Sequence, residues 1–300
     1  MLGHPGAARH LTSHADSRAG KGWQWSLEPW GMTLAVLSGS MSHHAFQVVC
    51  EIEPPTRPDL MHARHQIGTL SKVADSFLIP DNHLGRATVS SVAVAHEVEA
   101  MGGRSIACLN SRDRDMLGFR RDLLTAAAYG AGQFLFVYGD KPTSGGRTGE
   151  LTVQAMMDEL RRLPGDPAFA GAPLFPVGTA APLRAPPAGK RAADFLFVQV
   201  SFPLAALLRW REANPVELPV FAGVMTLASE AHAMRLAAAI PDIDIPTSLI
   251  EQVRSDRVAG VEATCDLVVQ IRDSGAFDGV HLIPVGRYCE VAARLEQRLR

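Results

Sequence analysis

Two glutamates at the end of an apolar run are the first residues whose spacing could support chemistry. Glu51 and Glu53 close the segment FQVVCEIE and are followed by two prolines. If this segment is a β-strand, residues two apart point to the same side, so both carboxylates share one face. Glu51 lies within the apolar run, where loss of hydration should raise the pKa of its carboxyl group. A carboxylic acid that stays protonated near neutral pH can donate a proton to a substrate.

The same two residues also allow structural roles. Glu51 could instead form an ordinary ion pair with an Arg or Lys side chain, and spacing alone does not choose between the two roles. Glu53 lies further along the chain, so solvation at a wet rim is one expectation for it. Alternatively, a second carboxylate on the same face could raise the pKa of Glu51 further, because like charges repel.

Polar side chains recur at the ends of other apolar runs. Asp140 follows QFLFVYG, and its carboxylate could accept N–H groups of a heterocycle or cap the next helix. Gln199 lies inside FLFVQVSF, where a buried amide needs partners, either structural or on a ligand. His281 in GVHLIPV is interpreted as a satisfied core histidine rather than a base. Further polar residues at such ends are Asp81, Asn82, His83, Asn110 and Thr226.

The elements that must position these residues alternate along the chain. Short apolar runs predict strands buried on both faces, as in a parallel sheet, at 46–52, 75–80, 104–110, 133–140, 173–178, 194–202, 218–225 and 277–286. Amphipathic stretches predict helices at 58–73, 87–102, 112–132, 149–163, 203–213, 229–240, 246–256, 258–274 and 287–300. This alternation fits either a barrel or a doubly wound open sheet.

Two observations favour the barrel. No GxGxxG motif follows the first strand, although a dinucleotide-binding open sheet would be expected to carry one. In a barrel, the polar residues at the strand ends would all meet at one mouth, where active sites lie. The sequence therefore predicts a single-domain TIM-like (β/α)8 barrel over residues 45–300.

Composition narrows the class of protein. A net charge of −2 gives no electrostatic reason to expect nucleic acid or an anionic membrane as a partner. No apolar run approaches the roughly 18 residues of a membrane span. The cysteines are far apart and form no CxxC pair, which predicts reduced, mostly buried thiols in a cytoplasmic protein: Cys50, Cys108, Cys265 and Cys289.

Residues 1–44 differ from the rest of the chain. They hold five of the 11 histidines and show neither a strand nor a helix period. We expect them to form a poorly ordered N-terminal extension, with Met32 and Met41 as alternative starts. The histidine spacing fits no known ligand pattern, so no metal site is predicted.

Several segments together resemble the methylenetetrahydrofolate reductase family. The E-x-x-P-P strand of that family resembles EIEPP at 51–55, and its apolar strand ending in R-G-D resembles FVYGDKP at 136–142. Its I-T-Q strand and following helix resemble ADFLFVQVSFPLAALLRWRE at 193–212. Its later P-I-x-P-G-I strand and helices resemble LPVFAGVMTLASEAHAMRLAAAIPDIDIPTSLIEQV at 218–253, and its closing segment resembles GVHLIPVGRYCEVAARLEQRL. The order is colinear from Phe46 to the C-terminus.

This resemblance implies a TIM-like barrel that reduces 5,10-methylenetetrahydrofolate to 5-methyltetrahydrofolate with NAD(P)H, usually through FAD, in one-carbon metabolism and methionine biosynthesis. By motif, Glu51 corresponds to the general acid, which opens the imidazolidine ring into an iminium that accepts hydride. Asp140 corresponds to the aspartate that holds the pterin near the flavin, and Gln199 to a glutamine that contacts folate. Arg287 falls where the family has an arginine near the folate tail.

The departures from the family pattern concern mostly the flavin. Tyr138 replaces the arginine of R-G-D, and FPVGTAAP at 175–182 lacks the family's His and Glu. The lysine-bearing helix before the glutamine strand is shortened, and the family's stacking aromatic falls near Glu230. These losses resemble a short, flavin-independent actinobacterial branch that passes hydride directly from NADH. We therefore expect NADH or NADPH as cofactor, with FAD as an alternative, and assign Asn110, Asp140 and Tyr138 to the cofactor side of the site.

Two alternatives stay open at the level of sequence. The first is a folate-binding barrel that lost catalysis together with its flavin contacts. The second is a barrel oxidoreductase that uses a deazaflavin. The expected partners are folate and a nicotinamide dinucleotide, and a homo-oligomer is compatible with the pattern.

Overall fold

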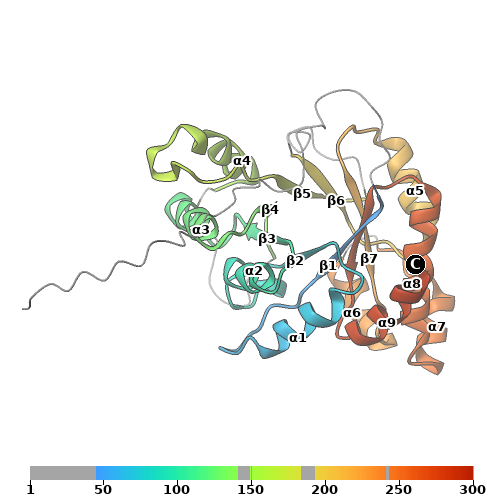
Figure 1. Ribbon diagram of the computed structural model, residues 1–300. Coiled ribbons are helices and arrows are strands. Elements are labelled where there is room, and N and C mark those ends of the chain that lie inside the picture. Colours follow the sequence, from blue (N-terminus) through green and yellow to red (C-terminus); the bar gives the residue numbers. More distant parts are fainter. Residues whose placement is uncertain (1–44, 141–148, 150, 184–192, 241–242, 300) are drawn as a thin grey trace, which may run out of the picture. The chain divides into compact units, whose positions relative to one another are not determined.

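The structure, a computed structural model, describes residues 45–140, 149, 151–183, 193–240 and 243–299. Within these ranges, parallel strands close into a barrel in simple chain order from β1 to β8 (Figure 1). They are β1 (Gln47–Glu51), β2 (Ser76–Ile79), β3 (Ser105–Asn110), β4 (Gln133–Val137), β5 (Val177–Ala181), β6 (Phe195–Val198), β7 (Val220–Met225) and β8 (Gly279–Ile283). The predicted TIM-like (β/α)8 barrel is confirmed. The predicted extension, residues 1–44, lies outside the described residues.

Helices follow the strands and surround the barrel (Figure 1). Each predicted helix has a counterpart: α1 (Met61–Leu70), α2 (Ser91–Ala100), α3 (Met116–Tyr129), α4 (Val153–Arg162), α5 (Leu204–Ala213), α6 (Glu230–Ala239), α7 (Thr247–Ser255), α8 (Ala259–Ser274) and α9 (Tyr288–Arg298). Helix α3 illustrates why the bounds fall where they do. The Asp115 side chain accepts a hydrogen bond from Gly118 N at its start, and Gly130 ends the helix in a left-handed conformation.

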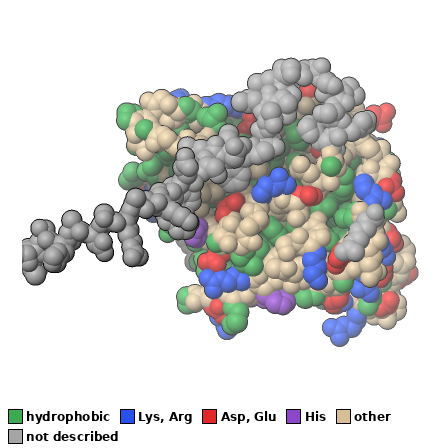
Figure 2. All heavy atoms as spheres, in the orientation of Figure 1, with side chains coloured by type: hydrophobic (Ala, Val, Ile, Leu, Met, Phe, Trp, Pro, Cys, Tyr) green, Lys and Arg blue, Asp and Glu red, His purple; other side chains and the backbone are tan. Residues whose placement is uncertain are grey.

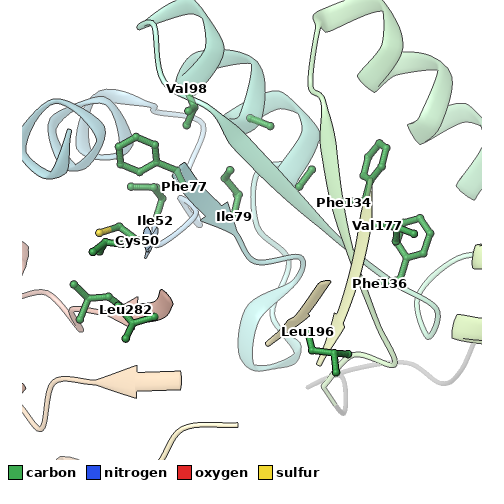
Figure 3. Packing of buried hydrophobic residues seen from close by; sticks show 14 of the residues in the cluster. Cys50, Ile52, Phe77, Ile79, Val98, Phe134, Phe136, Val177, Leu196 and Leu282 are labelled. Carbon is green, nitrogen blue, oxygen red and sulfur yellow. The ribbon is translucent and has the colours of Figure 1, made fainter. Parts of the chain in front are cut away.

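The alternation of strand residues creates two apolar layers. Cys50 and Ile52 point outward and pack under the helices, as do Phe77 and Phe134 (Figure 3). The intervening residues fill the barrel interior with Val49, Leu78, Ile106, Cys108, Leu135, Phe195, Phe197 and Phe221. Because side chains alternate along a strand, Glu51 at the end of β1 shares the inward face of Val49.

The fifth strand begins later than the sequence pattern indicates. The predicted strand at 173–178 contains Pro173 and Pro176, which have no N–H group for a sheet ladder. Strand β5 starts only after Pro176, whose carbonyl accepts a hydrogen bond of 3.0 Å from Phe134 N. Its sequence, VGTAA, is poor in large β-branched and aromatic residues, which explains why the pattern misplaced it.

Strands β4 and β6 are shorter than predicted. Strand β4 ends at Val137, so Tyr138 and Asp140 lie in the following loop. Strand β6 ends at Val198, which pairs with Ala181 and Ala222, so Gln199 also lies beyond its strand. Several polar residues singled out from the sequence therefore sit on the loops at the carboxyl ends of the strands.

The surface shows no segregation of charge on the face drawn in Figure 2, where acidic and basic side chains of the described residues are interspersed. This agrees with the net charge of −2. Among the described helices, none combines the length and the apolar character that crossing a membrane requires.

Candidate active site

Glu51 lies at the carboxyl end of β1, on the wall of the barrel mouth. Its side chain is 13% exposed, so the carboxylate is largely removed from water but still reachable from the mouth. Glu51 Oε2 lies 3.2 Å from Nε2 of His281 on β8, the strand that neighbours β1. Among the residues that the structure describes, Glu51 forms no ion pair with an Arg or Lys side chain, which was one of the two roles considered for it. Its close partner is an imidazole.

His281 is held inside the barrel by its neighbours. It pairs with Val49 of β1 and Gly223 of β7, and its ring stacks on Phe197 with centroids 5.0 Å apart. The prediction of a core histidine is confirmed by its 9% exposure. The prediction that it is satisfied is wrong within the described residues, because Nε2 is buried without a hydrogen-bond partner. The 3.2 Å approach to Glu51 has ion-pair distance without hydrogen-bond alignment.

Glu53 occupies a different environment from Glu51 despite the spacing of two residues. It lies beyond the end of β1 and is exposed. Its backbone N–H donates to Gln66 Oε1 at 3.1 Å, which ties the loop to helix α1. Of the two expectations for Glu53, the structure matches the wet rim.

Asp140 lies in the loop after β4 and is exposed. Its Oδ2 accepts a hydrogen bond of 2.8 Å from Leu84 N, in the loop after β2. Gly139 turns the chain here with a φ of 94°, and a Cβ at this position would lie 2.8 Å from Asn110 Cβ. Glycine is therefore needed to place Asp140 at the rim. An exposed carboxylate can accept further donors from a ligand.

Asn110, assigned to the cofactor side, is fully buried at the end of β3. Its Nδ2 donates to Asp81 and Asp113, and its Oδ1 accepts from the backbone N–H groups of Arg112 and Asp113. These contacts use both amide hydrogens and both acceptor positions of Asn110. In this conformation the Asn110 side chain holds a loop, and its assignment to the cofactor side stays a prediction.

A buried charged network surrounds Asn110. Asp81 also accepts a hydrogen bond from Arg114, and both side chains are almost fully buried. Burial raises the pKa of the Asp81 carboxyl, and the Arg114 guanidinium works against this rise without cancelling it. The network joins the loops after β2 and β3 and gives the rim near Asp140 a rigid base.

Tyr138 stands directly before Gly139 and is half exposed. The Arg112 guanidinium carbon lies 5.4 Å from the centre of the Tyr138 ring, a cation–π distance. The pair presents an aromatic ring and a cation at the carboxyl end of the barrel. Planar rings stack on such groups.

Gln199 is exposed, which contradicts the expected buried amide. Its backbone N–H donates to Ala181 O at 2.8 Å, and its Oε1 accepts from Val200 N at 3.2 Å. Because the ladder of β6 ends at Val198, the side chain emerges into the mouth instead of into the core. Its amide hydrogens are placed where a ligand could reach them.

Arg287 occupies the N-cap position of α9, without a capping hydrogen bond from its side chain, after a tight turn at the end of β8. Val285 has a φ of 46°, a left-handed conformation that β-branched residues rarely adopt, and Gly286 follows with a φ of 72°. Arg287 Nε lies 3.0 Å from Glu290 Oε1, and the arginine side chain is 17% exposed. This contact restrains the guanidinium on the rim.

The predicted site residues thus lie at the carboxyl ends of β1, β3, β4, β6 and β8. The direct side-chain contact that carries potential chemistry is between Glu51 and His281, and it links the first and last strands of the barrel. Because 230 positions separate the two residues, the sequence could have indicated this pair only through the alternation of side chains along β1 and β8, which places both residues on the inward face. In the described part of the chain, His, Cys, Asp and Glu side chains form no group of three suited to a metal ion.

The chain matches no protein-family model and no curated protein sequence. Solved structures do share its fold. An uncharacterized protein from Clostridium thermocellum, described as binding two copies of 5-methyl-5,6,7,8-tetrahydrofolic acid, superposes with a TM-score of 0.57 and 12% identity, covering 86% of this chain and 96% of that one. EDTA monooxygenase from Chelativorans sp. BNC1 superposes with a TM-score of 0.52 and 12% identity, covering 85% of this chain and 94% of that one. DmoA from Hyphomicrobium sulfonivorans superposes with a TM-score of 0.51 and 12% identity, covering 86% of this chain and 89% of that one. At such identities the likeness establishes the barrel fold alone.

Proposed function

We propose that this protein is a methylenetetrahydrofolate reductase, which reduces 5,10-methylenetetrahydrofolate to 5-methyltetrahydrofolate with hydride from NADH or NADPH. The observation that carries the proposal is the position of Glu51. Its carboxyl group lies at the mouth of a closed barrel, mostly removed from water, where the family resemblance requires a proton donor. The neighbour that binds 5-methyl-5,6,7,8-tetrahydrofolic acid supports the substrate class, because its ligand is the proposed product.

Glu51 supplies the proton in this proposal. The methylene carbon bridges two nitrogens of the imidazolidine ring. Protonation of one of these nitrogens opens the ring and leaves an iminium between the methylene carbon and the other nitrogen. The nicotinamide dinucleotide supplies the hydride that reduces this iminium to a methyl group. Each turnover therefore consumes one hydride and one proton, and Glu51 is a carboxylate until it is protonated again.

The other rim residues bind and orient the substrates. Asp140, exposed and anchored by Leu84 N, accepts N–H groups of the pterin. Gln199, exposed beside β6, offers amide hydrogens to the folate, and Arg287 attracts the carboxylates of its tail. Tyr138 with Arg112 offers a stacking surface for the nicotinamide or another planar ring. Holding both substrates at the mouth brings the hydride donor and acceptor into contact.

The first experiment is an assay of purified protein for NADH and NADPH oxidation in the presence of methylenetetrahydrofolate, with methyltetrahydrofolate measured as product. Turnover is expected with at least one of the two dinucleotides. An absorbance spectrum of the same preparation determines whether a flavin copurifies. The assay is repeated with added FAD, so that loss of a flavin during purification is not mistaken for inactivity.

The other outcomes identify the alternatives. Tight folate binding without oxidation of either dinucleotide, with or without FAD, would make the protein a folate-binding barrel. Turnover only with a reduced deazaflavin would make it a different barrel oxidoreductase. Either result contradicts the proposed reductase.

A further inference from the structure

The contact between Glu51 and His281 places a second proton-carrying group beside the proposed acid. Nε2 of His281 lies 3.2 Å from Glu51 Oε2, and the two side chains are 11% and 13% exposed. Imidazole is the side chain whose ordinary titration lies nearest to neutral pH. A carboxylate and an imidazole at this distance can exchange a proton once the two groups align for a hydrogen bond.

The surroundings of His281 give the ring a fixed orientation. Phe197 of β6 stacks against it with an interplanar angle of 29°. The β7 residue paired with it is Gly223, which presents no side chain, and the charged group that faces it from β1 is Glu51. The buried Nε2 has no hydrogen-bond partner among the described residues, so the packing brings a polar atom within ion-pair distance of Glu51 and leaves it unsatisfied.

We propose that His281 is a positioning residue for the proton donor: it fixes Glu51 through Nε2 and returns a proton to the carboxylate after each turnover. This inference rests on the proposed function and deepens it. After Glu51 has protonated the substrate, its Oε2 accepts a proton from the Nε2–H of an imidazolium. The imidazole that remains is protonated again by solvent, so the cycle takes up one proton and no other reactant.

A purely structural role is the competing explanation. Stacking on Phe197 would by itself account for a flat ring at this position. Phe197 belongs to an aromatic cluster, because Phe221 also packs edge-on against it, with centroids 5.2 Å apart. A structural role predicts that any flat apolar ring serves as well as imidazole. The positioning role predicts that the nitrogen is required.

His281→Phe tests the difference, because it keeps a ring against Phe197 and removes the nitrogen. We expect kcat to fall about 10- to 100-fold, at or below the lower end of the range for direct acid–base catalysis, while KM for methylenetetrahydrofolate stays within about three-fold. Phe221→Leu is the matched control, because it loosens the same aromatic cluster without touching a polar group. It should keep kcat within about two-fold.

Chemical rescue adds a readout that packing does not affect. In His281→Ala, added imidazole should restore part of the lost kcat, whereas pyrrole, which has the same shape and no basic nitrogen, should not. Equal rescue by both compounds, or a kcat of His281→Phe within two-fold of the wild-type value, would overturn the inference while leaving the reductase function intact.

A measurement without turnover separates this inference from the proposed function. In ¹⁵N spectra, the signal that disappears in His281→Phe identifies the His281 ring, and Glu51→Gln should move that signal. An unchanged signal would show that the two groups do not interact and would overturn the inference. Inactive wild-type protein would contradict the reductase function instead, and the spectra can be recorded on the same sample.

Discussion

At the scale of single residues, Glu51 and Glu53 show how two positions decide what a carboxylate can do. Glu51 is the last residue of β1 and lies against His281, whereas Glu53 is beyond the strand and exposed. A group that must deliver a proton to a substrate needs the first environment. The two residues therefore form a natural pair of test and control positions in one segment of chain.

The buried ion pair between Asp81 and Arg114 leads to a prediction about stability. Arg114→Met would leave the Asp81 carboxyl buried without its main cation, and breaking a buried pair in this way costs on the order of 3–5 kcal/mol. Urea unfolding should therefore show a much lower midpoint. Arg64→Met is the control, because Arg64 contacts Glu97 on the surface and is 56% exposed, so its midpoint should barely change. Equal effects of the two substitutions would contradict the proposed importance of the Asp81 network.

The residue-level predictions failed where tertiary contacts decide the outcome. Gln199 was expected to be buried because it interrupts an apolar run, but the ladder of β6 ends one residue earlier and releases it. His281 was expected to be satisfied, but its Nε2 has no hydrogen-bond partner among the described residues, and the carboxylate that approaches it comes from the other end of the chain. The alternation of side chains along a strand predicts which face of the sheet a residue points to. The length and register of the strand depend on its pairing with neighbouring strands, which the local sequence does not contain.

At the scale of elements, the sheet depends on small residues where large ones converge inside the barrel. Gly178 on β5 pairs with Phe195 on β6, and a Cβ on Gly178 would overlap the Phe195 ring. Phe195 cannot easily move away, because it also packs against Phe197 and Phe221. Leaving out one side chain on β5 is therefore what allows three phenylalanines to fill the interior.

Gly178→Ala should destabilise the protein by about 1–3 kcal/mol, the usual range for overpacking a core. Thermal unfolding followed by circular dichroism measures the effect. The double variant Gly178→Ala with Phe195→Leu should lose less than the sum of the two single changes, because the smaller side chain gives the new methyl group space. Gly165→Ala is the control, since a Cβ there meets nothing within 4 Å. Additive losses would show that the two positions do not compete for space.

The elements themselves were largely readable from the sequence. Continuous apolar runs such as QFLFV and FLFV mark strands buried on both faces, and the alternating amphipathic stretches mark the helices. Strand β5 escaped because VGTAA has no such run, and because the proline-bearing PLFPVG beside it resembles a strand more closely. Its position is set by pairing with β4 and β6, which no local pattern contains.

At the scale of the whole molecule, the packing of the barrel and its surrounding helices determines which cysteines reagents can reach. Cys50, Cys108 and Cys265 are buried, and Cys289 is exposed on α9. Burial raises the pKa of the Cys50 and Cys108 thiols and raises that of Cys265 to about 11, so few reactive thiolates form at neutral pH.

Native protein should therefore react with a thiol reagent at one fast position, and denatured protein at all four. Cys289→Ser should abolish the fast reaction and leave the slow ones unchanged. Fast labelling of Cys108, which lies inside the barrel, would mean that the barrel opens readily or is not closed in solution.

Closure also explains how far the site could be anticipated. Once the chain is assigned to a barrel, the carboxyl ends of the strands converge, so Glu51, Asp140 and Gln199 were expected on one face from the sequence alone. The contact between β1 and β8 is different, because it exists only when the ends of the sheet meet. The pairing of Glu51 with His281 is a property of the closed barrel, and no local segment of sequence contains it.

The most direct test of the central claim compares Glu51→Gln with Glu53→Gln in the dinucleotide oxidation assay with methylenetetrahydrofolate. We predict that Glu51→Gln lowers kcat by at least about 100-fold, because a proton donor at the reacting atom typically contributes that much or more. Folate binding, measured separately by calorimetry, should stay within about three-fold. Glu53→Gln should keep nearly full turnover. Undiminished turnover by Glu51→Gln, or equal losses in both variants, would contradict the assignment of Glu51 as the proton donor.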